Sequence, residues 1–175
     1  MVAGLGLGLP RILAGSDDQP KAAGASNAVR LAVVGMGATQ AVGGVGGRGH
    51  HLIPRLREVP GATIVALCDV DRTFLDRELQ PFKDRGETVA TYTRLRRVLD
   101  DKSIDAVVIA TPNHWHALAT VWACQAGKDV YVEKPFFYNL WEGRQMVAAA
   151  RRYGRMVQVG TQNRSNTLLR QPAGW

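Results

Sequence analysis

The sequence contains little cysteine and few aromatic residues, and it has no long hydrophobic run. Two of the 175 residues are cysteines, and Cys68 and Cys124 match no metal-ligand spacing, so we expect two buried, inert thiols. No stretch reaches the roughly 18 apolar residues that indicate a membrane-spanning helix, so no membrane association is expected. With 46% hydrophobic and 21% charged residues, the chain is predicted to form one globular domain, and it is too short for a second full one.

Acidic residues are missing from one end of the chain. Beyond Glu142 there are six arginines and no Asp or Glu, so the formal net charge of +7 is concentrated there. Neither a helix-turn-helix pattern nor an alternation of aromatic and basic residues accompanies these arginines. We therefore expect a solvated or interface-facing surface and no nucleic-acid partner.

The first 28 residues have no pattern of a folded element. MVAGLGLGLPRILAG resembles the apolar middle of an export signal, but the positively charged segment that should precede it is missing, and small polar residues follow. Residues 1–28 are therefore interpreted as a disordered tail or as the remnant of an export signal. The first interpretation predicts a cytoplasmic protein, and the second predicts an exported one.

From Val29 onward, short apolar segments alternate with segments of helical spacing. The strand-like segments cover 29–35, 62–69, 105–111, 129–133 and 155–160, with a weaker one at 87–92. The helix-like segments cover 49–57, 72–83, 93–100, 114–126 and 140–153. This alternation predicts right-handed crossovers and an α/β fold with a doubly wound parallel sheet, spanning residues 29–163.

Two overlapping glycine patterns lie between the first strand and the first helix. Gly35-Met36-Gly37 follows the strand directly, whereas the complete G-x-G-x-x-G at 44–49 lies nine residues further on. A phosphate-binding turn has to begin at the strand and close at the helix, because it uses free amide groups and the helix dipole. We predict a composite turn with an inserted loop at 38–46, in which Gly35 and Gly37 make the turn and Gly49 packs the helix on the sheet. The expected pyrophosphate contacts are Gly35, Met36, Gly37, Gly47, Arg48 and Gly49.

An acidic residue ends the second strand. Asp69 lies twenty residues after Gly49, the spacing at which a carboxylate accepts hydrogen bonds from the adenosine ribose. A carboxylate there repels a 2′-phosphate, which favours NAD over NADP. Asp69 could instead cap the next helix, although Asp71 is better placed for that. A mononucleotide P-loop is disfavoured because no Gly-Lys-Ser/Thr follows the turn, and an S-adenosylmethionine site stays open.

In combination, the motifs resemble the Gfo/Idh/MocA family of dehydrogenases. The resemblance runs from about Val29 to Asn166 and rests on the glycine turn, CDVD, ATPNHWHA, AGKDVYVEKP and VQVGTQNR in the family's order. It implies a Rossmann domain that binds NAD or NADP. It also implies substrates that are mostly sugars, inositols and related polyols, oxidised by hydride transfer.

The resemblance also implies roles for individual residues. Asp69 matches the ribose acid, and Lys134 matches the active-site lysine that binds the substrate hydroxyl or assists proton transfer. The other matched positions, near the nicotinamide or the substrate, are Thr111, Pro112, Asn113, His116, Glu133 and Gln162. Independently, alcohol oxidation releases a proton, and a lysine amine can accept it where its surroundings favour the neutral form. We expect Lys134 to project toward this pocket, and its bond to Pro135 is a candidate for the cis form.

No metal site is predicted near this segment. His114 and His116 are two positions apart and would not share a helix face. Trp115 is interpreted as a packing residue.

The sequence departs from the family at several points. The family's second domain would begin near Arg164, so residues 164–175 are interpreted as the truncated start of a linker to it. The insertion at 38–46 and the pair Phe136-Phe137 are further departures. Two functions stay open: the cofactor-binding half of an NAD-dependent sugar or polyol oxidoreductase, inactive alone, or a non-catalytic nucleotide-binding protein or inactive remnant. A homo-oligomer is expected only with the missing domain.

Overall fold

The branched apolar segments form one sheet in the computed structural model, which describes residues 28–37 and 47–162. The predicted tail up to residue 27, the inserted loop 38–46 and the segment 164–175 lie outside the described residues. All the strand pairs are parallel, in the order β3-β2-β1-β4-β5-β6. The strands are β1 (Val29–Val34), β2 (Ala62–Cys68), β3 (Ala90–Tyr92), β4 (Ala106–Ile109), β5 (Asp129–Glu133) and β6 (Val157–Gly160). This order confirms the predicted doubly wound sheet.

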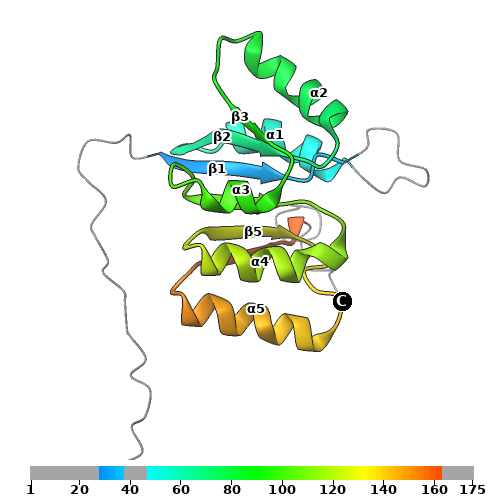
Figure 1. Ribbon diagram of the computed structural model, residues 1–175, viewed down its shortest axis with the longest axis vertical. Helices are drawn as coiled ribbons and strands as arrows, with labels where there is room; N and C mark the ends of the chain where they lie inside the picture. The colour runs from blue at the N-terminus through cyan, green and yellow to red at the C-terminus, as the bar shows by residue number, and fades with distance from the viewer. Residues whose placement is uncertain (1–27, 38–46, 163–175) are drawn as a thin grey trace, which may run out of the picture.

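Helices cover both faces of the sheet (Figure 1). They are α1 (Arg48–Arg57), α2 (Arg72–Lys83), α3 (Leu95–Asp100), α4 (His116–Gln125) and α5 (Leu140–Arg152), with a short 3-10 helix, η2 (Asn113–Trp115), before α4. None of the helices within the described ranges is long and apolar enough to cross a membrane.

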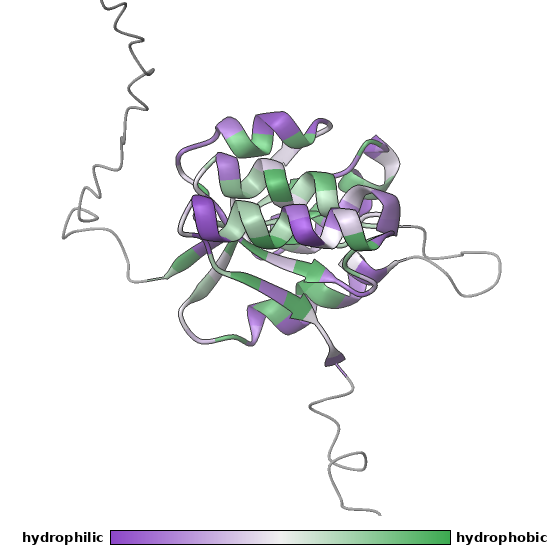
Figure 2. Cartoon of the chain, turned by 90° about the horizontal axis from the view of Figure 1, so that it is seen from below, coloured by the Kyte–Doolittle hydropathy of each residue, from purple (hydrophilic) through white to green (hydrophobic). Residues whose placement is uncertain are grey.

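Two apolar clusters hold the helices on the sheet. Val33 packs with residues of α1 and α2, whereas its neighbour Val34 packs with residues of α3, α4 and α5. Successive side chains of a strand point to opposite faces, so a strand covered on both faces is apolar throughout, as β1 is. In Figure 2 the strands are mostly green, and the outer sides of the helices carry the purple, hydrophilic residues.

Two helices differ from the prediction near the strand ends. The segment expected to be helical from residue 93 begins its helix at Leu95, because Arg94 has an extended backbone. The segment expected at 114–126 divides into η2 and α4, and the Trp115 N–H donates to the Pro112 carbonyl oxygen three residues before it. Both differences lie at the carboxyl edge of the sheet, where doubly wound folds bind ligands.

Candidate functional site

The glycine turn brings the first strand and the first helix into direct backbone contact. A Cβ atom on Gly49 would collide with the carbonyl oxygen of Gly35, and one on Gly35 would lie 2.7 Å from the backbone nitrogen of Thr111. The His50 N–H donates to the Met36 carbonyl oxygen at 3.2 Å, which ties α1 to the strand end. The structure therefore places Gly35 and Gly49 together across the inserted loop, while Gly44 and Gly46 lie outside the described residues.

The first turn of α1 is open toward the carboxyl edge. Gly47 precedes the helix in the left-handed conformation, with φ 73°, and no side chain caps the helix. Among the described residues, no hydrogen bond uses the backbone N–H of Arg48 or Gly49. Backbone amides at the positive end of a helix dipole suit a diphosphate, and the glycines at 35 and 49 allow the close backbone contact that brings these amides to the strand end.

The carboxylate of Asp69 is fixed beside this turn by backbone donors. Its Oδ2 accepts the Met36 N–H at 2.7 Å, and its Oδ1 accepts the Asp71 N–H at 3.0 Å. Each oxygen keeps a further lone pair for another donor. Asp71 caps α2 by accepting the Thr73 N–H at 2.8 Å, which confirms that the helix cap falls to Asp71 rather than to Asp69.

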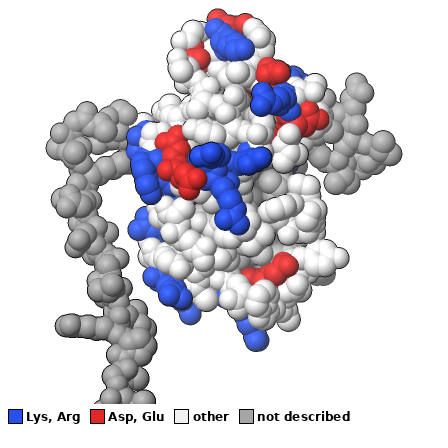
Figure 3. All heavy atoms as spheres, viewed as in Figure 1, with Lys and Arg blue, Asp and Glu red and all other residues white. Residues whose placement is uncertain are grey.

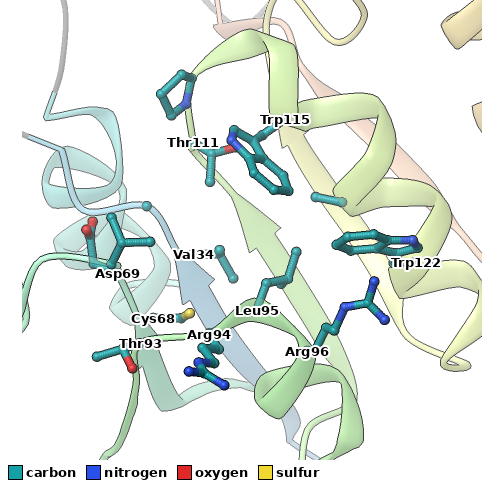
Figure 4. Close-up of a pocket in the computed structure, with 14 residues that line it drawn as sticks. Val34, Cys68, Asp69, Thr93, Arg94, Leu95, Arg96, Thr111, Trp115 and Trp122 are labelled. Carbon is teal, nitrogen blue, oxygen red and sulfur yellow. The ribbon is translucent and has the colours of Figure 1, made fainter.

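A cavity of about 500 Å³ opens beside Asp69 (Figure 4). In Figure 4, Asp69 and Thr93 lie at one end, Trp115 and Trp122 lie at the other, and Leu95 lies between the two ends. The cavity thus has one polar end and one aromatic end, which suits a ribose joined to a flat, apolar base.

Part of the cavity lining was not predicted from the sequence. Trp115, predicted to be a packing residue, is 42% exposed and lines the cavity, because η2 turns its indole over the opening. Thr93, Arg94 and Leu95 also line it and were assigned no role. These residues directly follow β3, which pairs with β2. Their place at the end of a predicted strand was the signal that could have identified them, because ligands bind at the carboxyl ends of parallel strands.

The thiol of Cys68 lies in the cavity lining but is inert. Burial, followed by the charge of Asp69, raises the pKa of this thiol to about 12. Burial also raises the pKa of Cys124, which lies in the α4 cluster. Both thiols are buried and free, as the sequence predicts.

The segment after β4 forms one wall, and His116 holds it in place. The His116 ring is 2% exposed, and its two nitrogens lie 2.7 Å from the carbonyl oxygens of Thr111 and Pro135. The ring therefore joins the ends of β4 and β5 and has no nitrogen left for a ligand. The Oγ1 of Thr111 is buried and has no hydrogen-bond partner among the described residues, so it can donate to a bound molecule.

The carboxylate of Glu133 joins three parts of the chain. Its Oε1 accepts the Arg48 Nε–H at 2.8 Å, and its two oxygens accept the Gln162 side-chain amide at 2.6 and 2.7 Å. The Tyr131 hydroxyl donates to the same Oε1 at 3.4 Å. Glu133 is 3% exposed, and its hydrogen bonds link the first residue of α1, β5 and the segment after β6.

Lys134 follows Glu133 at the carboxyl edge and is exposed. The Lys134-Pro135 peptide bond is cis. The Lys134 N–H donates to Glu133 Oε2 at 3.3 Å, and within the described ranges its side chain makes no hydrogen bond or ion pair. Within the same ranges, no group of three His, Cys, Asp or Glu residues is placed to hold a metal ion.

Comparison with known proteins gives consistent matches. A family model described as an oxidoreductase family with an NAD-binding Rossmann fold matches residues 29–161. The scyllo-inositol 2-dehydrogenase (NAD(+)) of Bacillus subtilis (strain 168) is 33% identical over 143 residues, which are 78% of this chain and 36% of that protein. A glycosyl hydrolase family 109 protein of Shewanella pealeana is 33% identical over 147 residues, 80% of this chain and 32% of that protein.

A solved structure agrees with these matches. The myo-inositol 2-dehydrogenase of Lactobacillus plantarum has a TM-score of 0.68 and 25% identity, and the alignment covers 80% of this chain and 38% of that one. The chain thus spans about a third of the length of the relatives it resembles.

Proposed function

The chain belongs to the Gfo/Idh/MocA oxidoreductase family, and on this premise we propose that it is the cofactor-binding half of an NAD-dependent enzyme acting on a sugar, inositol or related polyol. The observation that carries the proposal is the position of Asp69. Its carboxylate is held against the glycine turn at the polar end of a 500 Å³ cavity, with lone pairs left for two ribose hydroxyls.

The residues present fit an extended dinucleotide. The adenosine half would occupy the cavity, with its ribose on Asp69 and its base toward Leu95 and Trp115. The diphosphate would lie over Gly35 and Gly49 at the start of α1, where the backbone N–H groups of Arg48 and Gly49 donate to no described residue. The remaining half would continue along Thr111–Asn113, where the hydroxyl of Thr111 has no protein partner among the described residues.

Lys134 is proposed as the residue that binds the substrate hydroxyl or moves its proton. Bound NAD supplies the hydride acceptor, so the protein has to remove only a proton and orient the alcohol. Lys134 stands at the end of β5, and the Glu133 network fixes the backbone before it. In a protein completed by a substrate domain, Lys134→Met is expected to lower turnover about 100-fold, whereas NAD binding should be retained. Full turnover of that variant would remove the catalytic role.

Calorimetry with the 175-residue chain tests the cofactor assignment. NAD is expected to bind more tightly than NADP, because the 2′-phosphate would lie against the Asp69 carboxylate. Equal or inverted affinities would contradict the role of Asp69. Saturable binding of S-adenosylmethionine without NAD binding would favour a different ligand class.

The glycosyl hydrolase family 109 relatives support a second candidate, hydrolysis of a glycosidic bond. Both candidates use the same cofactor half, so the described residues favour neither. If the enzyme completed by a substrate domain is a dehydrogenase, it should accumulate reduced cofactor in proportion to the product formed. A hydrolase of this kind releases sugar without net reduction of NAD, and a chain that binds NAD without supporting either reaction would be a non-catalytic binding protein.

A further inference from the structure

A second concave surface lies beside α5, at the end of the molecule opposite α2 in Figure 1. Its cavity of about 450 Å³ is lined by Phe136, Phe137, Leu140 and Val147 among other residues. Leu140 is 74% exposed and Val147 is 47% exposed, and the adjacent Trp141 is 69% exposed. Contiguous exposed apolar side chains of this kind mark interaction sites.

The floor of this groove is built by close packing of the β5–α5 connection against the helix. The rings of Phe136 and Phe137 pack edge to face with centroids 4.3 Å apart. A Cβ atom on Gly143 would lie 2.8 Å from the ring of Phe137, so the missing side chain in α5 leaves space for that ring. A glycine inside a helix is less favourable than alanine, and here it shapes the groove.

Two arginines border the groove. Arg144 and Arg151 both line it, and neither forms an ion pair with another described residue. They are seven positions apart on α5, or about 10 Å along the helix axis. Figure 3 shows this lower part of the molecule as largely uncharged surface, with basic groups at its lower edge and an acidic group on its right side.

Acidic groups near the groove are few and occupied. From 143 to 162 the chain contains no Asp or Glu. Glu142, just before this range, lies in the first turn of α5 and accepts the Tyr138 N–H at 2.8 Å. The groove is therefore apolar in its centre and positive at its border.

We propose that this groove, between Phe136–Phe137 and the exposed side of α5, binds an acidic amphipathic helix of a partner protein. Apolar side chains at helical spacing would enter the groove, and carboxylates two turns apart would meet Arg144 and Arg151. Aromatic and arginine side chains are the residue types that dominate binding energy at such interfaces.

A second copy of this chain is disfavoured as the occupant, because copies with a formal net charge of +7 repel each other. None of the groove residues lines the cavity beside Asp69, so this proposal does not depend on the proposed function.

Fluorescence anisotropy with a labelled synthetic peptide tests this proposal. The probe is an amphipathic helix with leucines on one face and glutamates two turns apart beside them, and the control peptide has lysine at each glutamate position. The 175-residue chain is expected to bind the glutamate peptide saturably and at least tenfold more tightly than the lysine peptide. Addition of NAD should leave this binding unchanged, whatever the outcome for the cofactor site.

Matched variants separate the groove from general charge attraction. Arg144→Glu and Arg151→Glu should each weaken binding at least fivefold, and Val147→Glu should abolish it. Arg55→Glu makes the same charge change on α1, on the opposite face of the sheet, and should have little effect. Equal binding of the two peptides, or equal losses at Arg55 and Arg144, would overturn the proposal. A dimer in sedimentation that Val147→Glu dissociates would also overturn it, because a second copy would then occupy the groove.

Discussion

The ends of β2 and β5 carry two carboxylates in comparable positions with different surroundings. Asp69 follows β2, and among the described residues it accepts only the backbone N–H groups of Met36 and Asp71, so it keeps acceptor capacity toward the open cavity. Glu133 ends β5 and is 3% exposed, and side chains from α1, β5 and beyond β6 occupy both of its oxygens. An acidic residue at a strand end therefore serves a ligand or the fold according to which donors surround it.

The largest expected effect comes from removing the buried carboxylate. Glu133→Ala should lower the free energy of unfolding by about 3 kcal/mol, because the Tyr131 hydroxyl and the Gln162 amide lose their acceptor together with Arg48. Urea unfolding followed by circular dichroism measures this loss. Glu87→Ala removes the exposed partner of Arg57 and Arg85 and should have a much smaller effect. If both variants lost the same free energy of unfolding, Glu133 would contribute no more to stability than an exposed surface acid.

An intermediate effect, on binding rather than folding, is expected at the end of β2. Asp69→Ala should weaken NAD binding by about 1–3 kcal/mol, the cost of leaving hydrogen-bonding partners unpaired. Calorimetric titration measures the affinity, and its matched control is Asp71→Ala, which removes the α2 cap two residues away. If the two variants lose affinity equally, Asp69 acts only by supporting the turn.

The smallest effect concerns a third carboxylate, which is bound by side-chain and backbone donors together. The hydrogen bond from the Tyr92 hydroxyl, with those from Ser103, lowers the pKa of Asp101 below its ordinary value near 3.8. A carboxyl group whose pKa is lower in the folded than in the unfolded protein stabilises the fold at pH values above its unfolded-state pKa. This stabilisation is lost as the pH falls through the folded-state pKa. Tyr92→Phe should therefore lower the free energy of unfolding by less than about 1 kcal/mol at neutral pH. The difference in this free energy between variant and wild type should shrink below pH ~4.

Thermal unfolding of both proteins from pH 7 to pH 2 measures this dependence. A difference between wild type and Tyr92→Phe that stays constant across the range would assign the effect to packing of the ring.

Much of the fold was predictable from local pattern. The run of branched residues at 62–69 predicted β2 within one residue, and the spacing at 72–83 predicted α2 over the same range. These two elements can be predicted from neighbouring residues alone, because a continuous apolar run indicates a strand buried on both faces and the spacing of apolar residues indicates a helix. The 3-10 turn at Asn113–Trp115 was missed because it depends on a local hydrogen bond to Pro112 rather than on hydrophobic spacing.

The site was predictable in position but less so in the arrangement of its side chains. The strand ends and the glycine spacing identified Asp69 and the paired Gly35 and Gly49. The partners of Glu133 lie 85 and 29 positions away, at Arg48 and Gln162, and no local pattern indicates such contacts. The aromatic end of the cavity was missed for the same reason, because α3 and α4 come together only in the folded sheet.

The central place of β1 has a consequence for synthesis on the ribosome. β1 emerges before every other strand, yet in the finished sheet it lies between β2 and β4. Its second edge therefore has no partner until Ala106–Ile109 has left the exit tunnel, long after β2 can pair with the first edge. During that interval the nascent chain carries an open, apolar strand edge that can pair with other chains. We expect the yield of soluble protein to depend on how quickly translation passes β4.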